Sequence, residues 1–368
     1  MKIKKIIRFL FLFFALINLS GCSENQQIHQ KLVVQGIGID FEENKYIVTV
    51  QALDFKNPVD ENEPNVRIIQ TSGPALLGAL DNISKQTSLI PIYSQNMVII
   101  LGKNVAEIGI DSFIDFFIRH CETRPKVKIC VTQNKAFEIL NIKSSEGKTL
   151  KAKDICDLIP DELNSDILHF VSDLKNGISS SYIAWVEANN QAGGKGVCLQ
   201  GVATFFDNVL DSFLSDKDAY GFMILKGVPN FGSSTISMEG FGDVTCLINK
   251  ISNNTKVSIK DGNPYFDINL NIDVSVFAMD KKYEFYFDEE TKNLIAEKFS
   301  KEIENICKDV INLCISNGED VFRWGRILKN SNPSYFKEVE NGWSENIKKC
   351  SYKLNQNINI AATGKEPI

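Results

Sequence analysis

The stretch KLVVQGIGIDFEENKYIVTVQALD, residues Lys31–Asp54, decides how the fold begins. Two runs rich in valine, isoleucine and other strand-forming residues, Lys31–Asp40 and Tyr46–Asp54, flank the polar sequence FEENK. A short polar link between two such runs is typical of a β-hairpin. We therefore expect the folded part of the chain to open with two antiparallel strands.

The segment before this hairpin has the features of a lipoprotein signal. Four basic residues precede nine apolar ones at Phe9–Ile17, a run too short to span a membrane. Leu19-Ser20-Gly21-Cys22 then forms a lipobox, in which the cysteine thiol receives the lipid before cleavage. We predict a signal peptide at 1–21, lipid attachment at Cys22 and a polar tether at 22–30, on the outer face of the cytoplasmic membrane. The alternative is a secreted protein that is cleaved elsewhere.

Charge and cysteine content limit the possible partners. Residues 1–21 contain four of the 40 basic residues and no acidic ones, so 36 basic and 46 acidic residues remain, a net charge of −10. Such an acidic surface repels nucleic acid, and we predict no nucleic-acid partner. Beyond Cys22 the chain has eight cysteines without a CxxC pair, which we expect to be mostly buried thiols rather than a disulfide framework.

Alternating strand and helix patterns predict an α+β fold. Polar stretches without periodicity, such as Lys143–Lys153, suggest three mixed α/β domains at 31–145, 146–230 and 231–368. Each is expected to contain a mostly antiparallel sheet with flanking helices. Apolar residues that recur every three or four positions predict one long helix in the third domain, at about 289–316.

The motifs that would indicate an enzyme are incomplete. Three histidines, His29, His120 and His169, occur without the spacing of a metal site. Gly36-Ile37-Gly38 lacks the third glycine of a dinucleotide loop, and Ser145–Lys148 lacks the downstream motifs of penicillin-binding enzymes. We predict no catalytic, metal-binding or cofactor-binding residue.

Several segments, taken in order, resemble the C-subunit family of spore germinant receptors, the Ger(x)C lipoproteins. After the lipobox, the segments that carry the resemblance are Lys31–Asp54, Ser94–Pro125, Val127–Leu140, Lys195–Gly227 and Asp320–Gly364. Two positions depart from the family pattern. The tryptophan that usually follows the lipidated cysteine is missing, and the family's Asp-x-Phe-Gly is here Asp320-Val321-Phe322-Arg323-Trp324-Gly325.

This resemblance implies a fold of three mixed domains and a non-enzymatic role. The chain would act with two integral membrane subunits, of the A and B types, in the inner membrane of the spore, and would be required for the germination response to nutrients. The resemblance assigns no ligand residues, so contact with a small-molecule germinant is left open.

Two other classes of exported protein share some of these features. A solute-binding lipoprotein of a membrane importer would be anchored in the same way, but it usually has parallel βαβ lobes, whereas this chain opens with a hairpin. An enzyme that acts on peptidoglycan would need a nucleophile, an acid pair or a metal motif, although two carboxylates could be brought together by the fold alone.

Overall fold

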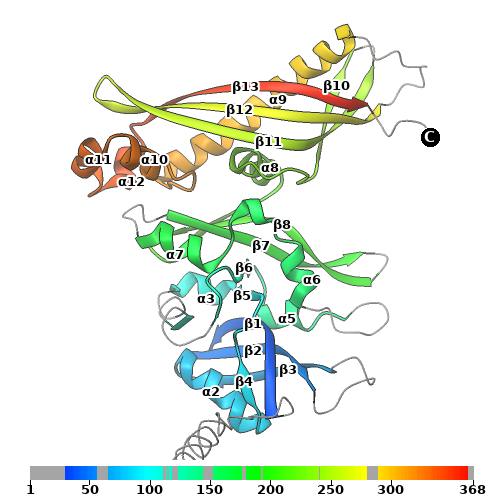
Figure 1. Ribbon diagram of the computed structural model, residues 1–368, viewed down its shortest axis with the longest axis vertical. Coiled ribbons are helices and arrows are strands. Elements are labelled where there is room, and N and C mark those ends of the chain that lie inside the picture. Colours follow the sequence, from blue (N-terminus) through cyan, green and yellow to red (C-terminus); the bar gives the residue numbers. More distant parts are fainter. Residues whose placement is uncertain are drawn as a thin grey trace, which may run out of the picture.

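A computed structural model describes residues 30–55, 65–110, 113, 116–117, 123–143, 152–175, 180–191, 194–239, 241–279 and 289–363. The predicted signal peptide, Cys22 and all but the last residue of the predicted tether lie outside the described residues. The molecule is elongated, with a large sheet in its lower and middle parts and a second sheet above them (Figure 1).

The chain opens with the predicted hairpin. Strand β1 (Lys31–Glu42) pairs antiparallel with β2 (Lys45–Asp54), which in turn pairs antiparallel with β3 (Asn65–Gly73). The two residues between β1 and β2 have φ values of 49° and 59°. This left-handed conformation is the one that suits the twist of a tight two-residue hairpin turn.

The large sheet continues with parallel pairs in its centre and antiparallel pairs at its far end. Its strand order is β3-β2-β1-β5-β6-β7-β8-β9, and β4 pairs with β1. The remaining strands are β4 (Ile90–Ile92), β5 (Val98–Gly102), β6 (Lys128–Thr132), β7 (Ser180–Gln191), β8 (Gly194–Phe206) and β9 (Val209–Leu214). The pairs β1–β5, β5–β6 and β6–β7 are parallel. The mostly antiparallel arrangement that we expected is therefore limited to the ends of this sheet.

The predicted domain boundary at 145/146 lies within this sheet. Strands β6 and β7 come from opposite sides of that boundary and are direct neighbours, with Cys130 opposite Ala184. A polar stretch indicates a loop, but the loop need not be a linker between domains. In a parallel sheet it can be part of the crossover connection between two adjacent strands. The strands of the first two predicted domains consequently form one sheet.

Helices cover both faces of the large sheet. They are α2 (Leu76–Thr87), α3 (Lys103–Ile108), α5 (Ala136–Leu140), α6 (Ala152–Asp157) and α7 (Ile167–Lys175), with a 3₁₀ turn η2 at Asp161–Leu163. Side chains of a strand point alternately to the two faces. Ile99 and Leu101 of β5 accordingly pack with α2, α3 and α7, whereas Val98 and Ile100 belong to the core that contains α5 and α6.

The second sheet curves over one long helix (Figure 1). Its order is β10-β11-β12-β13, formed by Ser233–Met238, Gly242–Lys260, Asn263–Met279 and Ser351–Thr363. Its helices are α8 (Asp216–Lys226), α9 (Glu289–Asn317), α10 (Trp324–Ser331), α11 (Pro333–Val339) and α12 (Trp343–Ile347). Helix α9 occupies the region where the sequence predicts a helix at about 289–316.

The two sheets share one hydrophobic core. Phe222 of α8, Val202 of β8 and Phe266 of β12 belong to the same buried cluster. Helices α8 and α9 approach closely at Gly221, where an added Cβ would lie 2.9 Å from the Ile306 carbonyl oxygen. Because the core is continuous, we expect the two parts to behave as one body.

Two further features of the described part bear on the sequence predictions. Its seven cysteines are free thiols, four of them buried. None of its helices is both long enough and apolar enough to cross a membrane.

Candidate functional site

The segment Glu319–Arg326, EDVFRWGR, follows α9 and includes the first residues of α10, at the junction between the two sheets. Its aromatic side chains enter the hydrophobic core. Trp324 stacks on Phe266 of β12, with ring centroids 4.2 Å apart, and Phe322 lies 5.6 Å from Phe222 of α8. The charged residues of the same segment make polar contacts at the junction; they are Glu319, Asp320, Arg323 and Arg326.

Asp173 of α7 binds two arginines of this segment. Arg323 donates from Nε and Nη2 to Asp173 Oδ2, at 3.0 and 2.9 Å, and Arg326 Nη2 donates to Oδ1 at 3.1 Å. The Asp173 side chain is 3% exposed and that of Arg323 is 17% exposed. One buried carboxylate thus links α7, on the large sheet, to the start of α10 in the second part.

The backbone of Arg323 is in the left-handed conformation, with φ 61° and ψ 34°. This conformation costs a residue other than glycine roughly 1 kcal/mol. In this chain the ion pair with Asp173 offsets the conformational cost of an arginine.

Asp320 holds the beginning of α10 in place. Its Oδ1 accepts a hydrogen bond from the Trp324 backbone N–H at 2.6 Å, and its Oδ2 accepts from the Gly325 N–H at 2.6 Å and from Trp343 Nε1 at 2.8 Å. Burial raises the pKa of Asp320 to about 6, while these three donors act to lower it. The carboxylate therefore satisfies helix donors that would otherwise be buried without a partner.

Glu319, the neighbouring residue, makes a second link to the large sheet. Thr204 of β8 donates to Glu319 Oε1 at 2.8 Å, and Glu319 also hydrogen-bonds to Asp211 of β9. The Glu319 side chain is buried, and burial together with Asp211 raises its pKa to about 8. Near neutral pH the Glu319 carboxyl group consequently keeps its proton.

Replacing Glu319 with glutamine is expected to remove a pH dependence of stability. The pKa of Glu319 is raised from 4.5 to about 8 in the folded protein. Between these two pH values the folded protein therefore binds more protons than the unfolded chain. Stability must fall as the pH rises through this interval, by about 1.4 kcal/mol for each unit by which the pKa is raised. Glu319→Gln can still donate to Asp211 and accept from Thr204, but it does not titrate.

Urea unfolding at a series of pH values from about 5 to 8 tests this expectation. The free energy of unfolding of Glu319→Gln should increase relative to that of the wild type as the pH rises. Parallel curves for the two proteins would show that Glu319 does not hold a proton at the junction.

A lysine and a tyrosine complete the cluster. Lys226 Nζ lies 4.5 Å from the centroid of the Tyr182 ring, and Arg323 Cζ lies 5.9 Å from the same centroid. The Tyr182 hydroxyl donates to the Leu163 carbonyl at 3.0 Å. Burial and the neighbouring Arg323 cation lower the pKa of Lys226 to about 7, whereas the carboxylates of Asp173 and Asp320 act to raise it.

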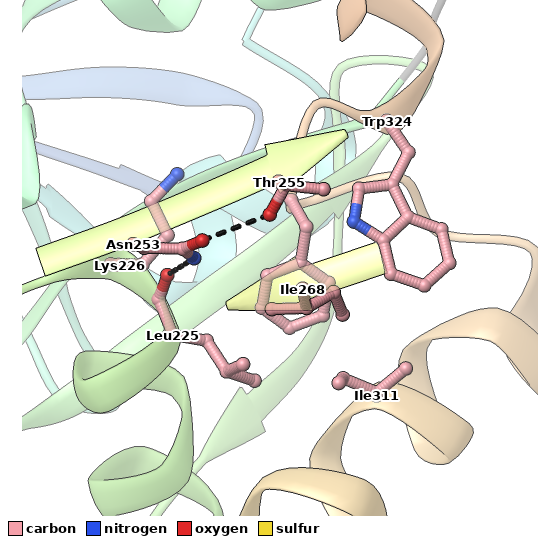
Figure 2. A pocket seen from close by; sticks show the side chains of 8 residues that line it. Leu225, Lys226, Asn253, Thr255, Ile268, Ile311 and Trp324 are labelled. Carbon is pink, nitrogen blue, oxygen red and sulfur yellow. Dashed lines mark hydrogen bonds between the residues drawn. The ribbon is translucent and has the colours of Figure 1, made fainter. Parts of the chain in front are cut away.

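A small cavity lies beside this cluster (Figure 2). Its volume is about 40 Å³, and its lining includes Lys226, Ile268, Ile311 and Trp324. Asn253, at its edge, donates to the Leu225 carbonyl at 2.7 Å and accepts from the Thr255 hydroxyl at 2.9 Å. Small-molecule sites usually measure about 300–1,000 Å³. This cavity fits a few water molecules and is too small for a nutrient.

The sequence predicted none of these junction residues as a site. Asp173 and Arg323 are 150 positions apart, and only the fold brings them together. The one signal available was the mixture of acidic, aromatic and basic residues directly after a long helix. Cys22, the only site residue predicted, lies outside the described residues.

Of the other sequence motifs, His169 and Gly38 lie in the described ranges, whereas His29, His120 and Ser145–Lys148 lie outside them. His169 Nδ1 lies 2.8 Å from Asp166 Oδ2 at the start of α7. An added Cβ on Gly38 would lie 3.0 Å from that of Ala136, so this glycine permits close packing of α5 on β1. Within the described ranges, no three histidine, cysteine or acidic residues are grouped as metal ligands would be.

Comparison with known proteins assigns the chain to a family. Residues 24–186 match the spore germination protein N-terminal domain, and residues 200–364 match the spore germination B3/GerAC-like C-terminal domain. Together the two matches cover nearly the whole chain. The chain belongs to the Ger(x)C family of spore germination proteins. The matched regions meet within the β7–β8 hairpin, so the junction cluster joins a residue of the first region, Asp173, to arginines of the second.

Individual relatives agree with this assignment. The chain is 22% identical to spore germination protein B3 of Bacillus subtilis (strain 168) over 98% of its own length and 100% of that protein. It is 28% identical to spore germination protein A3 of the same organism over 39% of each chain. The crystal structure of the GerBC protein matches with a TM-score of 0.57 and 19% identity, covering 89% of this chain and 97% of that one.

The α+β class and the receptor role expected from the sequence are confirmed by these matches. The chain is a subunit of a spore germinant receptor. The importer alternative is not favoured, since both regions of the chain match germination proteins. Members of this family are not known as enzymes.

Proposed function

We propose that this Ger(x)C protein is a non-enzymatic subunit, held by a lipid at Cys22 to the outer face of the cytoplasmic membrane, which becomes the inner membrane of the spore. There it assembles with integral membrane subunits of the A and B types and is required for the germination response to nutrients. The match of both family regions in order, over nearly the whole chain, carries this proposal.

The chemistry of the junction supports a non-enzymatic role. Asp173, Glu319 and Asp320 are the kind of buried carboxylates that often serve as catalytic acids or bases. Each of them is engaged by side chains or backbone N–H groups of the protein itself, and the adjoining cavity is too small for a nutrient. Such an arrangement fixes the relative positions of two parts of the molecule.

A lipid anchor supports the proposed assembly in a physical way. A folded body on a short tether remains close to the membrane, and a short flexible linker gives an effective concentration in the millimolar range toward membrane partners. Weak contacts with the integral subunits would then suffice for assembly.

Replacing Cys22 with alanine is expected to shift most of the chain from the membrane fraction to the soluble fraction and to abolish the germination response. The thiol is the acceptor of the lipid, and several acyl chains, each contributing about 0.8 kcal/mol per buried CH₂, are needed for stable anchoring. A strain lacking the gene would be complemented with the wild type or with Cys22→Ala. Germination would be followed by the loss of optical density over a panel of nutrients.

Ser23→Ala provides the matched control, because it alters the adjacent tether residue but keeps the thiol. It should restore germination as well as the wild type does. A Cys22→Ala chain that stays in the membrane fraction would contradict the lipid anchor. Normal germination of the deletion strain with every nutrient would contradict the required role.

A further inference from the structure

A groove of about 420 Å³ lies between α8, β10 and α9, away from the junction cluster. Asp216, Lys217 and Tyr220 of α8 line one side, Glu302 and Ile306 of α9 line another, and residues 231–235 complete it. Residues 233–235 are the first half of β10, so the groove runs beside a strand of the second sheet.

Strand β10 is a terminal strand of its sheet (Figure 1). It pairs with β11 over six consecutive residues, from Ser233↔Leu247 to Met238↔Gly242, and within the described ranges no strand pairs with its other side. Proteins usually protect such an edge with lysine, proline or a bulge. The sequence of β10, SSTISM, contains no charged residue and no proline, and its pairing with β11 is uninterrupted.

The lining of the groove indicates what it could bind. Phe231, which is partly buried, supplies apolar surface next to the buried Ile306, while Asp216 and Glu302 supply two carboxylates. The single cation, Lys217, lies 3.8 Å from Glu302 and its side chain is 81% exposed. Negative groups are thus in excess, and they favour a partner that carries a positive charge.

We propose that an extended segment of one of the integral receptor subunits adds to the free edge of β10 as a fifth strand, placing an apolar side chain on Phe231 and Ile306 and a basic side chain toward Asp216 and Glu302. Addition of a strand to an open edge gives affinity through main-chain hydrogen bonds and specificity through alternate side chains. This inference rests on the proposed function, because it requires the receptor assembly.

Photo-crosslinking on the assembled receptor tests the proposal. The full-length chain would be produced together with both integral subunits, with p-benzoylphenylalanine in place of Thr235, which lines the groove, or of Ser237, which does not. Both residues are exposed and lie on the same side of β10, so they form a matched pair. After irradiation of the membranes, the crosslinked peptide would be identified by mass spectrometry.

We expect position 235 to crosslink at least about tenfold more strongly than position 237 to a single segment of one integral subunit that carries a basic residue. Thr235→Arg, which adds a cation at the edge of the groove, should reduce co-purification of that subunit by about tenfold, equivalent to about 1.4 kcal/mol, whereas Ser237→Arg should leave it unchanged. Equal unfolding midpoints of the two variants would exclude a folding defect.

The remaining outcomes overturn the proposal in distinguishable ways. If the subunits co-purify but position 235 crosslinks to neither of them, the groove is not their contact, although the receptor role stands. A crosslink to a second copy of this chain would assign the edge to self-association. If the subunits do not co-purify even with the wild-type chain, the proposed assembly itself fails, and the groove proposal fails with it.

Discussion

Replacement of Asp173 with alanine is expected to lower the free energy of unfolding by about 3–5 kcal/mol. This carboxylate is the shared partner of Arg323 and Arg326. Its removal leaves two guanidinium groups in a largely buried junction without the charge that compensates their desolvation. The loss should exceed that of an exposed ion pair such as Lys301–Glu297, since exposed pairs usually contribute less than about 1 kcal/mol.

Urea unfolding followed by circular dichroism measures this loss, and Ser172→Ala serves as the control. Ser172 adjoins Asp173 and accepts a hydrogen bond from Arg326 Nη2 at 2.9 Å, but it contributes no charge. Ser172→Ala should cost about 1 kcal/mol, the usual contribution of one such bond. Similar losses for both variants would mean that the arginines find other partners and that Asp173 does not hold the junction together.

The position of Asp173 also links stability to the proposed function. The carboxylate joins the two regions recognised as separate family domains, and the hydrophobic core is continuous across the same junction. A partner that binds the second sheet, as proposed for β10, would therefore act on a body whose two parts are fixed relative to each other. Loss of the junction should weaken the germination response even where both parts remain folded.

Local signals in the sequence were sufficient for some elements of the fold. The hairpin of β1 and β2 follows from strand-forming residues around a polar turn, and α9 follows from apolar residues at helical spacing. Each of these patterns lies within its own stretch of about 30 consecutive residues, and over that length the periodicity of apolar residues is informative. The resemblance of whole segments then identified the family.

The arrangement of the central strands could not be predicted in the same way. Pairing of β1 with β5 and of β6 with β7 depends on contacts between residues about 50 or more positions apart. The polar stretch around residues 143–153 looked like a domain boundary, because a loop within one sheet and a linker between domains have the same composition. The sequence alone does not distinguish them.

The junction was missed for a related reason. On an isolated helix, Asp173 looks like a solvent-exposed residue of α7, and Arg323 looks like an ordinary surface charge. Their burial results from the packing of α10 on α7, which no local pattern reports. Arg323 was visible in the sequence, but its role depends on a positive φ and on a partner 150 residues away.

Replacement of Asp320 with alanine is expected to cost about 3–5 kcal/mol as well, for a different reason. Its carboxylate accepts from three buried donors, the backbone N–H groups of Trp324 and Gly325 and the indole N–H of Trp343. The start of α10 and the ring of Trp343 would both lose their acceptor, and the alanine would also leave a small void. Because Trp324 stacks on Phe266, this loss should reach the core of the second sheet.

Two further variants separate the hydrogen bonds from the packing. Asp320→Asn keeps the shape of the side chain. If its single oxygen accepts from the Trp324 N–H, its NH₂ group must face the Gly325 N–H and the Trp343 indole N–H, which are donors themselves. This variant should therefore cost about 2–3 kcal/mol. Trp343→Phe removes the indole N–H together with part of a buried ring, but it keeps an aromatic ring beside Phe336 and leaves Asp320 two of its three donors, so it should cost about 1–2 kcal/mol. If these residues act through the hydrogen bonds to Asp320, the loss of unfolding free energy in urea should be largest for Asp320→Ala, smaller for Asp320→Asn and smallest for Trp343→Phe. An Asp320→Asn protein as stable as the wild type would show instead that Asp320 acts through its shape, and that α10 begins where it does without help from the carboxylate.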